Sequence, residues 1–422
     1  MPTPDRRALL KGVAFATGSL ALGFPRGLFA QNEAIADLKS LTTGIAPISK
    51  QERAARIARA QSLMRANDIG AVLIEPGASL VYFTGVQWHR SERLTAAVIP
   101  AEGSPIIVTP FFEKPSVAES LAIPADIRVW QEHENPLLQV SAFLTERGLN
   151  KARIGIEETA RFFAFDGLRT ALPGATLVSA NPVVRGCRMR KTPAEIALMQ
   201  AASDVTVAAY SWTVPRIRAG MTPLDIGALM TSATRVLGGD PEFALVLIGE
   251  AAAYPHGSGK PQVVTPGAIV LMDCGCTVQG YQSDISRTFV HGADPTPEQR
   301  RVWNQVAKGQ QVAFSAARLG APAGAVDDAV RAYYTSLGYG PDYALPGLSH
   351  RTGHGIGMEG HEPVNLVRGE TTRLAEGMCF SNEPGLYLPG HFGVRMEDCF
   401  HMTATGPKWF SQPPTSIDAP LG

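Results

Sequence analysis

Three of the nine histidines in this chain of 422 residues lie in one short segment near the C-terminal end. The segment, residues 347–365, reads GLSHRTGHGIGMEGHEPVN and contains His350, His354 and His361. Clustered histidines are typical of metal sites and of sites for proton transfer. The glycines around His354 could form a phosphate loop, but no strand-to-helix pattern and no following lysine accompany them. We therefore interpret the segment as part of a metal site or of a substrate-binding site.

Four carboxylates lie in or beside strand-like segments of the same half of the chain, at Asp273, Asp284, Glu383 and Glu397. A short link, residues 276–282, allows the segments of the two aspartates to pair as a hairpin. An aspartate in an apolar strand is costly unless it is paired or bound to a metal. For either aspartate alone, a place at the exposed edge of a strand is an equal alternative.

Together with His354, these carboxylates give an oxygen-rich set of donors. Such a set suits hard or borderline cations, so Mn(II), Fe(II), Co(II) and Zn(II) are candidates, and ligand hardness favours Mn(II). If two cations are bound, Asp284 and Glu397 are the natural shared ligands.

The order and the surroundings of these residues resemble one known family, the pita-bread metallopeptidases, which include prolidase, aminopeptidase P and methionine aminopeptidase. The matching features are Asp273, Asp284 with Ser283 before it and Arg287 after it, the HxxGHGIGxxxHE run at 350–362, Asn382 to Gly385 around Glu383, and Arg395 to Asp398 around Glu397. Five ligands in this order are a far more specific signal than any single motif. The segment before them resembles the creatinase-type N-terminal domain of prolidase and aminopeptidase P.

The resemblance implies an α/β creatinase-like N-terminal domain followed by an α+β pita-bread catalytic domain. It also implies two divalent metal ions with a bridging water or hydroxide, held by Asp273, Asp284, His354, Glu383 and Glu397. In such a centre the metals lower the pKa of the water and polarise the scissile carbonyl.

The resemblance assigns roles to the residues around the metals as well. Glu383 would act as general base and pass the proton to the leaving nitrogen. His256 and His361 would be catalytic and substrate-binding residues that donate hydrogen bonds to the substrate carbonyl or the tetrahedral intermediate. His350 would be a further residue of the substrate pocket, and Arg395, beside the last ligand, would either orient that ligand or contact the substrate.

The expected activity is that of a metal-dependent exopeptidase that hydrolyses the Xaa-Pro bond at the N-terminus of peptides or in dipeptides. The proline imide has no N–H and resists ordinary peptidases, so a shaped pocket is needed. The sequence leaves open whether the substrate is a dipeptide or a longer peptide. Dimeric relatives imply a homodimer. Trp88 would then either reach the site of the other subunit or, as an equal alternative, lie in the core of its own domain.

Three other roles of the same fold are alternatives. A creatinase-like enzyme works without metal and would lack the ligands, whereas all five are present here. An iron-dependent lyase acting on dimethylsulfoniopropionate would carry an additional aspartate near Asp273, whereas residues 272–276 offer one carboxylate only. A catalytically inactive binding module would not require an intact ligand set. We therefore favour a metal-dependent hydrolase.

Two domains are expected to position these residues. Between residues 50 and 182, apolar strands alternate with helices, which predicts an α/β domain. The strands are expected at 70–74, 94–100, 105–109, 153–156 and 176–179, the helices at 53–67, 135–147 and 162–171, and a turn at 80–85.

The catalytic domain is expected from residue 186 to residue 415. Three helix starts share one pattern there, because Thr192, Thr222 and Thr296 are each followed by proline, which suits a capped helix N-terminus. Strands are expected at 263–271, 281–291, 378–381 and 393–402. The mixture of helices and antiparallel strands predicts an α+β domain.

The first 30 residues are expected to belong to neither domain. Arg6 and Arg7 precede an apolar run at 12–22, as in a twin-arginine export signal. We therefore expect a periplasmic or otherwise exported protein that is not stably inserted in the membrane.

The composition limits the partners of the chain. Lys plus Arg and Asp plus Glu both number 38, so the net charge is zero and no overall field favours nucleic acid or anionic lipid. Five scattered cysteines argue against a disulfide framework and a structural zinc site. The partner that we expect is a small peptide substrate.

Overall fold

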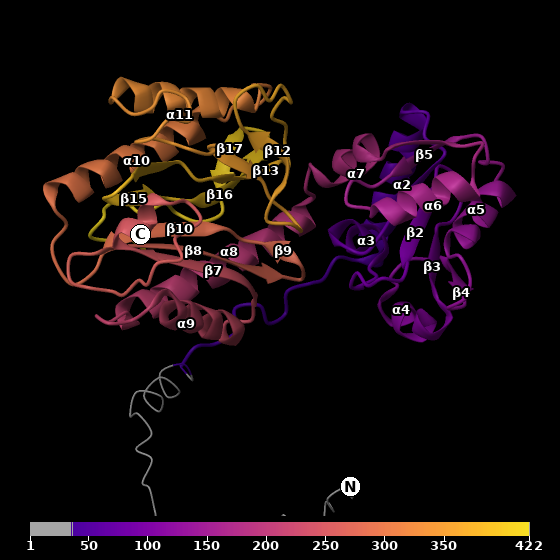
Figure 1. Cartoon of the computed structure of the whole chain (residues 1–422), viewed down its shortest axis with the longest axis horizontal. Helices are drawn as coiled ribbons and strands as arrows, with labels where there is room; N and C mark the ends of the chain where they lie inside the picture. The colour runs from indigo at the N-terminus through magenta and orange to yellow at the C-terminus, as the bar shows by residue number, and fades with distance from the viewer. Residues whose placement is uncertain (1–34, 36, 422) are drawn as a thin grey trace, which may run out of the picture. The chain divides into compact units, whose positions relative to one another are not determined.

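The computed structural model of the chain describes residue 35 and residues 37–421. The predicted export signal at residues 1–30 lies outside the described residues. From Ser40 onward the described chain forms one compact unit, which contains two groups of sheets and helices (Figure 1). Within this described part, no helix is both long enough and apolar enough to cross a membrane.

The N-terminal group is built on one six-stranded sheet with the order β4-β3-β2-β1-β5-β6. The strands are β1 (Ala71–Ile74), β2 (Ala96–Pro100), β3 (Ile106–Pro110), β4 (Asp126–Trp130), β5 (Arg153–Ile156) and β6 (Thr176–Ser179). Strand β2 pairs antiparallel with β1 and β3, and the other neighbours pair in parallel. The central strands are buried on both faces, because helices cover both faces of the sheet.

Alternate residues of the strands contribute to two separate cores. Val72 and Ile74 pack with α2, α3, α4 and α7, whereas Ala71 and Leu73 pack with α5 and α6. This division follows from the two-residue period of a strand. The helices are α2 (Lys50–Ala66), α3 (Ala78–Thr84), the short η1 (Phe111–Glu113), α4 (Lys114–Ser120), α5 (Leu137–Glu146), α6 (Phe162–Ala171) and α7 (Asn181–Arg188). The expected α/β architecture is confirmed.

Several parts of this domain differ from the expectation, since α4 and β4 were not predicted and two further segments take another form. Residues 80–84 of the predicted turn form most of α3, and Gly85, with a φ of 81°, caps the C-terminus of this helix. The burial of Phe83 against the sheet outweighs the preference of aromatic and β-branched residues for strands. The domain also continues beyond the predicted end at residue 182, because α7 buries Val183 in the same core.

Four long helices belong to the second group of elements. They are α8 (Pro193–Thr213), α9 (Pro223–Val236), α10 (Pro297–Ala316) and α11 (Gly324–Ser336), with short helices η2 (Val214–Arg216) and η3 (Gly249–Ala253). Thr192, Thr222 and Thr296 cap the first three, and each hydroxyl accepts a hydrogen bond from the backbone N–H three residues further on. The predicted capping pattern is confirmed at all three starts.

The strands of this second group pair antiparallel throughout the described chain. One sheet has the order β10-β8-β7, with β9 also on β8: β7 (Asp240–Ile248), β8 (Ile269–Val278), β9 (Tyr281–Gln282) and β10 (Ile285–Val290). Another has the order β12-β11-β13-β16-β17: β11 (Gly353–Gly355), β12 (Glu362–Leu366), β13 (Cys379–Asn382), β16 (Asp398–Thr403) and β17 (Gly406–Trp409). A hairpin is formed by β14 (Gly385–Leu388) and β15 (Phe392–Arg395). The predicted strand at 393–402 is therefore interrupted, and Glu397 lies in the interruption.

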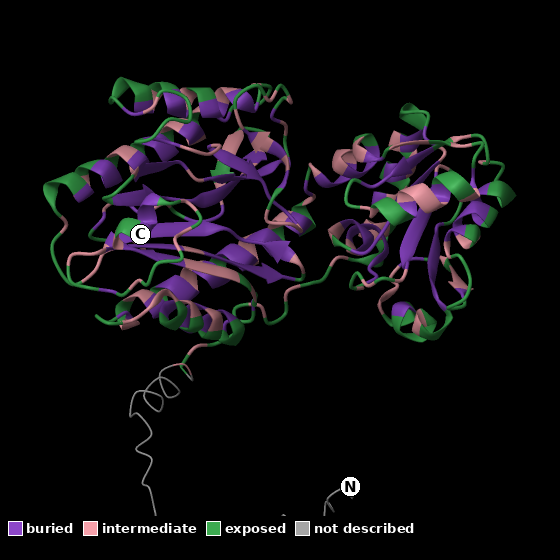
Figure 2. Ribbon diagram, in the orientation of Figure 1, coloured by how far each residue is buried: buried purple, intermediate pink, exposed green. Residues whose placement is uncertain are grey.

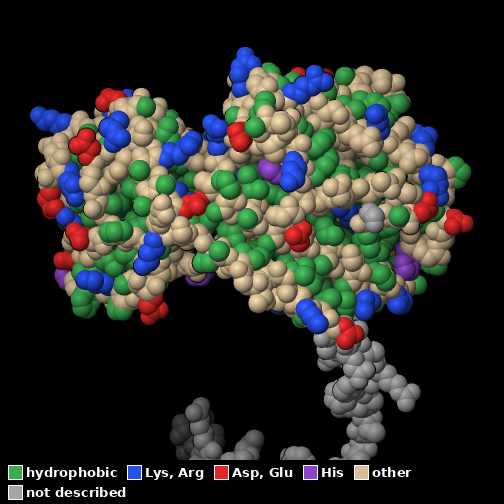
Figure 3. Space-filling view, turned by 180° about the vertical axis from the view of Figure 1, so that it is seen from behind, with side chains coloured by type: hydrophobic (Ala, Val, Ile, Leu, Met, Phe, Trp, Pro, Cys, Tyr) green, Lys and Arg blue, Asp and Glu red, His purple; other side chains and the backbone are tan. Residues whose placement is uncertain are grey.

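The sheets of the second group meet around the predicted site. A bridge between Ser286 of β10 and Glu397 joins the first sheet to the segment between β15 and β16. Trp303 of α10 fills the core with apolar side chains of both sheets. Figure 2 shows the strands as mostly buried and the helices as exposed on their outer faces. On the face seen in Figure 3, positive and negative side chains are interspersed.

Candidate metal centre

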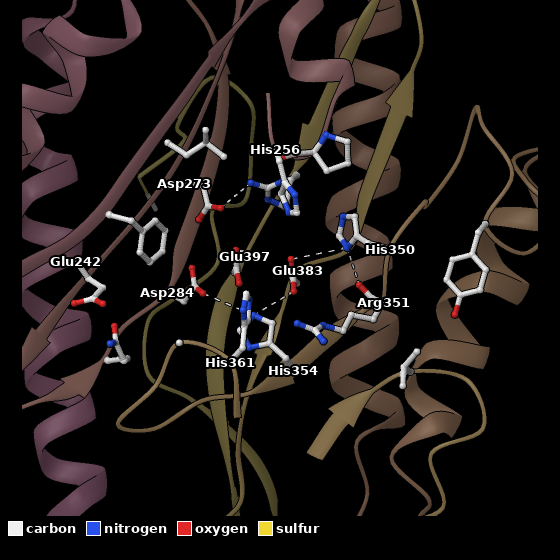
Figure 4. A pocket seen from close by; sticks show the side chains of 18 residues that line it. Glu242, His256, Asp273, Asp284, His350, Arg351, His354, His361, Glu383 and Glu397 are labelled. Atoms are coloured by element: carbon white, nitrogen blue, oxygen red, sulfur yellow. Dashed lines mark hydrogen bonds and ion pairs between the residues drawn. The ribbon is translucent and has the colours of Figure 1, made fainter. Parts of the chain in front are cut away.

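The structure brings the five predicted metal ligands to one pocket of about 680 Å³. They come from different strands or strand ends: Asp273 in β8, Asp284 just before β10, His354 in β11, Glu383 just after β13, and Glu397 between β15 and β16. Figure 4 shows their polar atoms turned toward a common centre. The strand register explains the meeting of the first and last ligands, because Ser286 lies opposite Asp273 on one side and Glu397 on the other.

His354 lies among the carboxylates as the nitrogen donor of the set. Its Nε2 atom is 3.3 Å from Glu383 Oε1 and 3.7 Å from Asp284 Oδ2. Asp284, His354 and Glu397 each offer one ligand atom, and these three atoms lie within 4.8 Å of one another. The Nδ1–H of His354 donates to the Gly355 carbonyl at 3.1 Å, which leaves the Nε2 lone pair facing the carboxylates. Burial holds the pKa of His354 well below its usual value, so the ring is neutral.

Three buried carboxylate oxygens of this pocket have no hydrogen-bond partner: Asp273 Oδ1, Asp284 Oδ1 and Glu397 Oε1. Burial raises the pKa of Asp284 and of Glu397 well above the usual value, and neighbouring carboxylates add to the rise. Burial also raises the pKa of Glu383, to about 7. Buried carboxylates without partners are costly, and cations placed among them would pair these oxygens. The donor set therefore fits divalent cations.

Arg395 holds two of the ligands in place. Its guanidinium, which is 3% exposed, donates from Nη2 to Asp273 Oδ2 at 2.7 Å and from Nε to Ser286 Oγ at 3.0 Å. The Ser286 hydroxyl in turn donates to Glu397 Oε2 at 2.9 Å. Arg395 lines the pocket, as its predicted contact with substrate requires. Its donors nevertheless face protein atoms, so in the structure it orients Asp273 and, through Ser286, Glu397.

His256 and His361 both line the pocket with exposed side chains. The ring of His361 stands perpendicular to that of His354, with the ring centres 4.1 Å apart. Neither His256 nor His361 forms a side-chain hydrogen bond with another described residue. Their ring nitrogens are therefore free to contact a ligand in the pocket.

His350 also lines the pocket, but both of its ring nitrogens are engaged. Its Nδ1–H donates to the Arg351 carbonyl at 2.8 Å, and its Nε2 accepts from the Tyr387 hydroxyl at 2.7 Å. Burial lowers the pKa of His350 to about 3. The ring therefore forms a neutral, fixed wall of the pocket.

Arg351 is a pocket residue that the sequence analysis missed. Figure 4 shows its guanidinium pointing toward Glu383 and His354. Within the described part of the chain, its side chain forms no ion pair and no hydrogen bond. Glu242, also missed, is exposed and lines the opposite side of the pocket (Figure 4). Trp88 packs against the core of the N-terminal domain and does not line this pocket. The position of Arg351 directly after His350 in the motif was the one signal that could have identified it.

Comparisons with known proteins match both groups of elements. The model of metallopeptidase family M24 matches residues 197–404, and that of the creatinase/prolidase N-terminal domain matches residues 56–190. An Xaa-Pro dipeptidase of Lactobacillus helveticus is 32% identical over 350 residues, which cover 82% of this chain and 93% of the relative. The crystal structure of dipeptidase PepE from Mycobacterium ulcerans matches with a TM-score of 0.80 and 31% identity, over 88% of this chain and 98% of the other. An Xaa-Pro dipeptidase from Bacillus anthracis matches with a TM-score of 0.76 and 26% identity, over 86% and 98%.

These matches confirm the expected creatinase-like N-terminal domain and pita-bread catalytic domain. Membership of a metallopeptidase family implies divalent metal ions, which the cluster of Asp284, His354 and Glu397 fits. The chain belongs to metallopeptidase family M24 and carries a creatinase/prolidase-type N-terminal domain before its catalytic domain.

Proposed function

We propose that this protein is a metal-dependent Xaa-Pro dipeptidase that uses two divalent cations. The observation that carries the proposal is the meeting of four carboxylates and His354 in one pocket, with three buried carboxylate oxygens left without a partner. The names of similar proteins, Xaa-Pro dipeptidase and dipeptidase, support the choice of substrate. Each of these relatives aligns with this chain over both the N-terminal and the catalytic domain.

The cations would be held by Asp273, Asp284, His354, Glu383 and Glu397. Asp284 and Glu397 would be shared between them, because one ligand atom of each lies within 4.8 Å of the other and of His354, and each retains an oxygen without a hydrogen-bond partner. Four of the five donors are carboxylates, so ligand hardness favours Mn(II) over Co(II), Zn(II) and Fe(II). When bound, such cations lower the pKa of a water molecule and polarise the carbonyl of the bond to be cleaved.

Glu383 would take the proton of the attacking water and deliver it to the leaving nitrogen. Its side chain is 14% exposed, the most accessible of the ligands after Asp273. It directly follows β13 at the wall of the cavity, beside His354. Protonation is required because a nitrogen leaves the tetrahedral intermediate readily only as a neutral amine, and the proton taken from the water supplies this.

His256 and His361 would bind the carbonyl oxygen of the bond that is cleaved. Both line the pocket, and neither is tied to another described side chain, so each has a ring nitrogen that can donate. A donor placed where negative charge develops stabilises the transition state more than the ground state. His350, fixed by Tyr387, would shape the space for the proline ring.

Arg351 would meet the free carboxylate of a dipeptide. It brings a positive charge into the pocket without a carboxylate partner among the described residues. A substrate carboxylate would supply that partner, and an arginine–carboxylate pair is a strong and directional contact. Glu242, on the other side of the pocket, would face the substrate ammonium group. A cavity with opposite charges at its two sides favours a zwitterionic dipeptide over a longer chain.

The twin arginines Arg6 and Arg7 support the further proposal that the enzyme is exported folded, with its metals, to the periplasm. We also propose that it works as a homodimer, as the resemblance to the prolidase family implies. Cell fractionation of the full chain and of an Arg6→Lys, Arg7→Lys variant tests the first point, and light scattering tests the second. Unchanged export of the variant, or a monomer in solution, would contradict the respective proposal.

A substrate series tests the proposed activity. The manganese-loaded protein is offered an Xaa-Pro dipeptide, the same dipeptide with its C-terminus amidated, an Xaa-Pro tripeptide and an Xaa-Ala dipeptide. We expect fastest cleavage of the first, as measured by release of the N-terminal residue Xaa, which is a product of all four substrates. Cleavage of none of the four would overturn the peptidase proposal and favour a small-molecule enzyme of the same fold. Equal cleavage of dipeptide and tripeptide would overturn the dipeptide preference alone.

A further inference from the structure

His361 is presented by a short loop, residues 356–361, which joins β11 to β12. The side chain is exposed in the pocket, and its ring meets the His354 ring at a right angle. An exposed histidine on a loop must be held in one place to act on a substrate, because small displacements of a catalytic group are costly. The contacts that hold this loop are therefore relevant to activity.

Glu362, the residue after His361, folds this loop around its own carboxylate. Its Oε1 atom accepts hydrogen bonds from the backbone N–H groups of Met358, at 2.9 Å, and Glu359, at 3.2 Å. Glu362 is 4% exposed, and a Cβ atom at Gly357 would lie 2.8 Å from its carboxylate oxygens. The loop is thus closed tightly over a buried negative charge.

Two basic side chains compensate this charge. Arg188, the last residue of α7, donates from Nη2 to Glu362 Oε1, and Lys191 donates from Nζ to Oε2 at 3.0 Å. Burial would raise the pKa of Glu362, but Lys191 and Arg188 outweigh burial and hold that pKa at about 2. Removal of one partner from such a buried group is strongly unfavourable, because the remaining charge is left under-compensated.

Arg188 extends this network into the N-terminal domain. Its Nη1 atom donates to the Ser79 hydroxyl of α3 at 2.9 Å, and its Nη2 atom also donates to Glu359 Oε2 at 2.8 Å. Met358 of the loop packs against the core of the same domain. Ser79, Arg188 and Glu362 therefore connect the N-terminal domain to the residue next to His361.

We propose that Arg188 and Glu362 are positioning residues through which the N-terminal domain fixes the loop that presents His361. The inference rests on the proposed contact of His361 with the substrate carbonyl. Loss of the Arg188 contact would lower kcat more than it raises KM, because His361 would act on charge that develops during the reaction.

Arg56 offers a matched control. It is 3% exposed and joins the N-terminal domain to the catalytic domain through an ion pair of 3.4 Å with Glu195 and a hydrogen bond of 2.9 Å to Tyr281. None of its contacts in the described chain reaches the loop at 356–361. Arg56→Gln and Arg188→Gln thus each remove one buried cation between the domains, but only Arg188 contacts Glu359 and Glu362 directly.

The test combines kinetics with hydrogen–deuterium exchange on the manganese-loaded enzyme. Arg188→Gln is expected to lower kcat on an Xaa-Pro dipeptide about tenfold, with KM changed less than about threefold. Exchange of residues 356–362 should become faster in this variant and stay unchanged in Arg56→Gln. In a His361→Ala background, Arg188→Gln should lower kcat no further, as for two residues that act through one contact. If Arg188→Gln fails to fold, Ser79→Ala serves in its place, because it removes only a neutral hydroxyl. Exchange of residues 356–362 should become faster in this variant too.

Two results would overturn the proposal. One is that Arg188→Gln lowers kcat in the His361→Ala background by the same factor as in the wild-type enzyme. The other is unchanged exchange of residues 356–362 in Ser79→Ala and Arg188→Gln. Hydrogen–deuterium exchange needs no substrate, so it tests the link between the N-terminal domain and the loop independently of activity. Full activity of His361→Ala would contradict the proposed role of His361, but not this link.

Discussion

The chelated protein is expected to lose stability as the pH rises from about 6.5 to 8, because burial and mutual repulsion oppose the ionisation of its crowded carboxylates. Burial, with neighbouring carboxylates, raises the folded-state pKa of Asp284 and Glu397 well above the usual value. In the unfolded chain both groups ionise near pH 4. A group whose pKa is higher in the folded than in the unfolded state stabilises the folded protein. This contribution is complete below the unfolded-state pKa and is lost as the pH rises through the folded-state pKa.

The size of the effect follows from the number of protons that the cluster retains. Each carboxyl group that stays protonated only in the folded state costs about 1.4 kcal/mol of unfolding free energy per pH unit. Over about 1.5 pH units, one retained proton costs about 2 kcal/mol, or about 4–8 °C in Tm for a domain of roughly 200 residues. The window starts near pH 6.5 because two buried histidines act in the opposite direction at lower pH. Burial lowers the pKa of His350 and His354, so below their unfolded-state pKa of about 6.5 they destabilise the folded protein as the pH falls.

Thermal unfolding of the EDTA-treated protein across this window, with and without added Mn(II), measures the effect. Asp284→Asn removes one of the repelling charges, so it should raise the Tm of the chelated protein at the upper end of the window and abolish the stabilisation by Mn(II). Asp328→Asn is the matched control, because the Asp328 side chain is 53% exposed on the surface, and it should change neither quantity. A wild-type Tm that stays constant or rises with pH in the chelated protein would refute the reasoning.

Three further substitutions separate other parts of the site. Arg351→Gln should raise the KM for an Xaa-Pro dipeptide about tenfold and leave the KM for its C-terminal amide unchanged; initial rates with both compounds decide this, and equal changes would contradict a carboxylate contact. Ser286→Ala should weaken Mn(II) binding about tenfold in calorimetric titration, because Glu397 Oε2 loses its donor; an unchanged affinity would contradict that role. Tyr387→Phe should raise KM roughly threefold with little change in kcat, since His350 loses the donor at its Nε2; a fall in kcat at constant KM would exclude a role in substrate binding alone.

The parts of the fold that depend on local sequence were predictable. Thr192, Thr222 and Thr296 start helices without help from elsewhere, because each hydroxyl accepts from the N–H three residues later and the side chain there accepts from the threonine N–H. The proline that follows each threonine has no N–H to satisfy. Helix α3 was mistaken for a turn, because burial of Phe83 against a distant sheet decides its conformation. The end of the N-terminal domain was placed too early for the same reason, since α7 is joined to that domain by packing.

The candidate site was predictable as a set of residue types, and less so as a set of contacts. The motifs identified His354 and the four carboxylates, and the structure brings them together. Arg395 carries no signal in the sequence that it would bind Asp273 and Ser286, because those contacts join strands far apart in the chain. Glu362 is part of the motif, but its partner Arg188 lies in another domain, so only the folded chain shows the pair.

The central claim is that two divalent cations in this pocket enable cleavage of an Xaa-Pro dipeptide. The most direct test is proline release by the chelated enzyme as Mn(II) is added in increments, with bound metal counted in the same samples. The account predicts no release without metal, and a rise that saturates when each chain holds two ions. Full activity in the chelated protein, or no release at any loading with Mn(II), Co(II), Zn(II) or Fe(II), would contradict it.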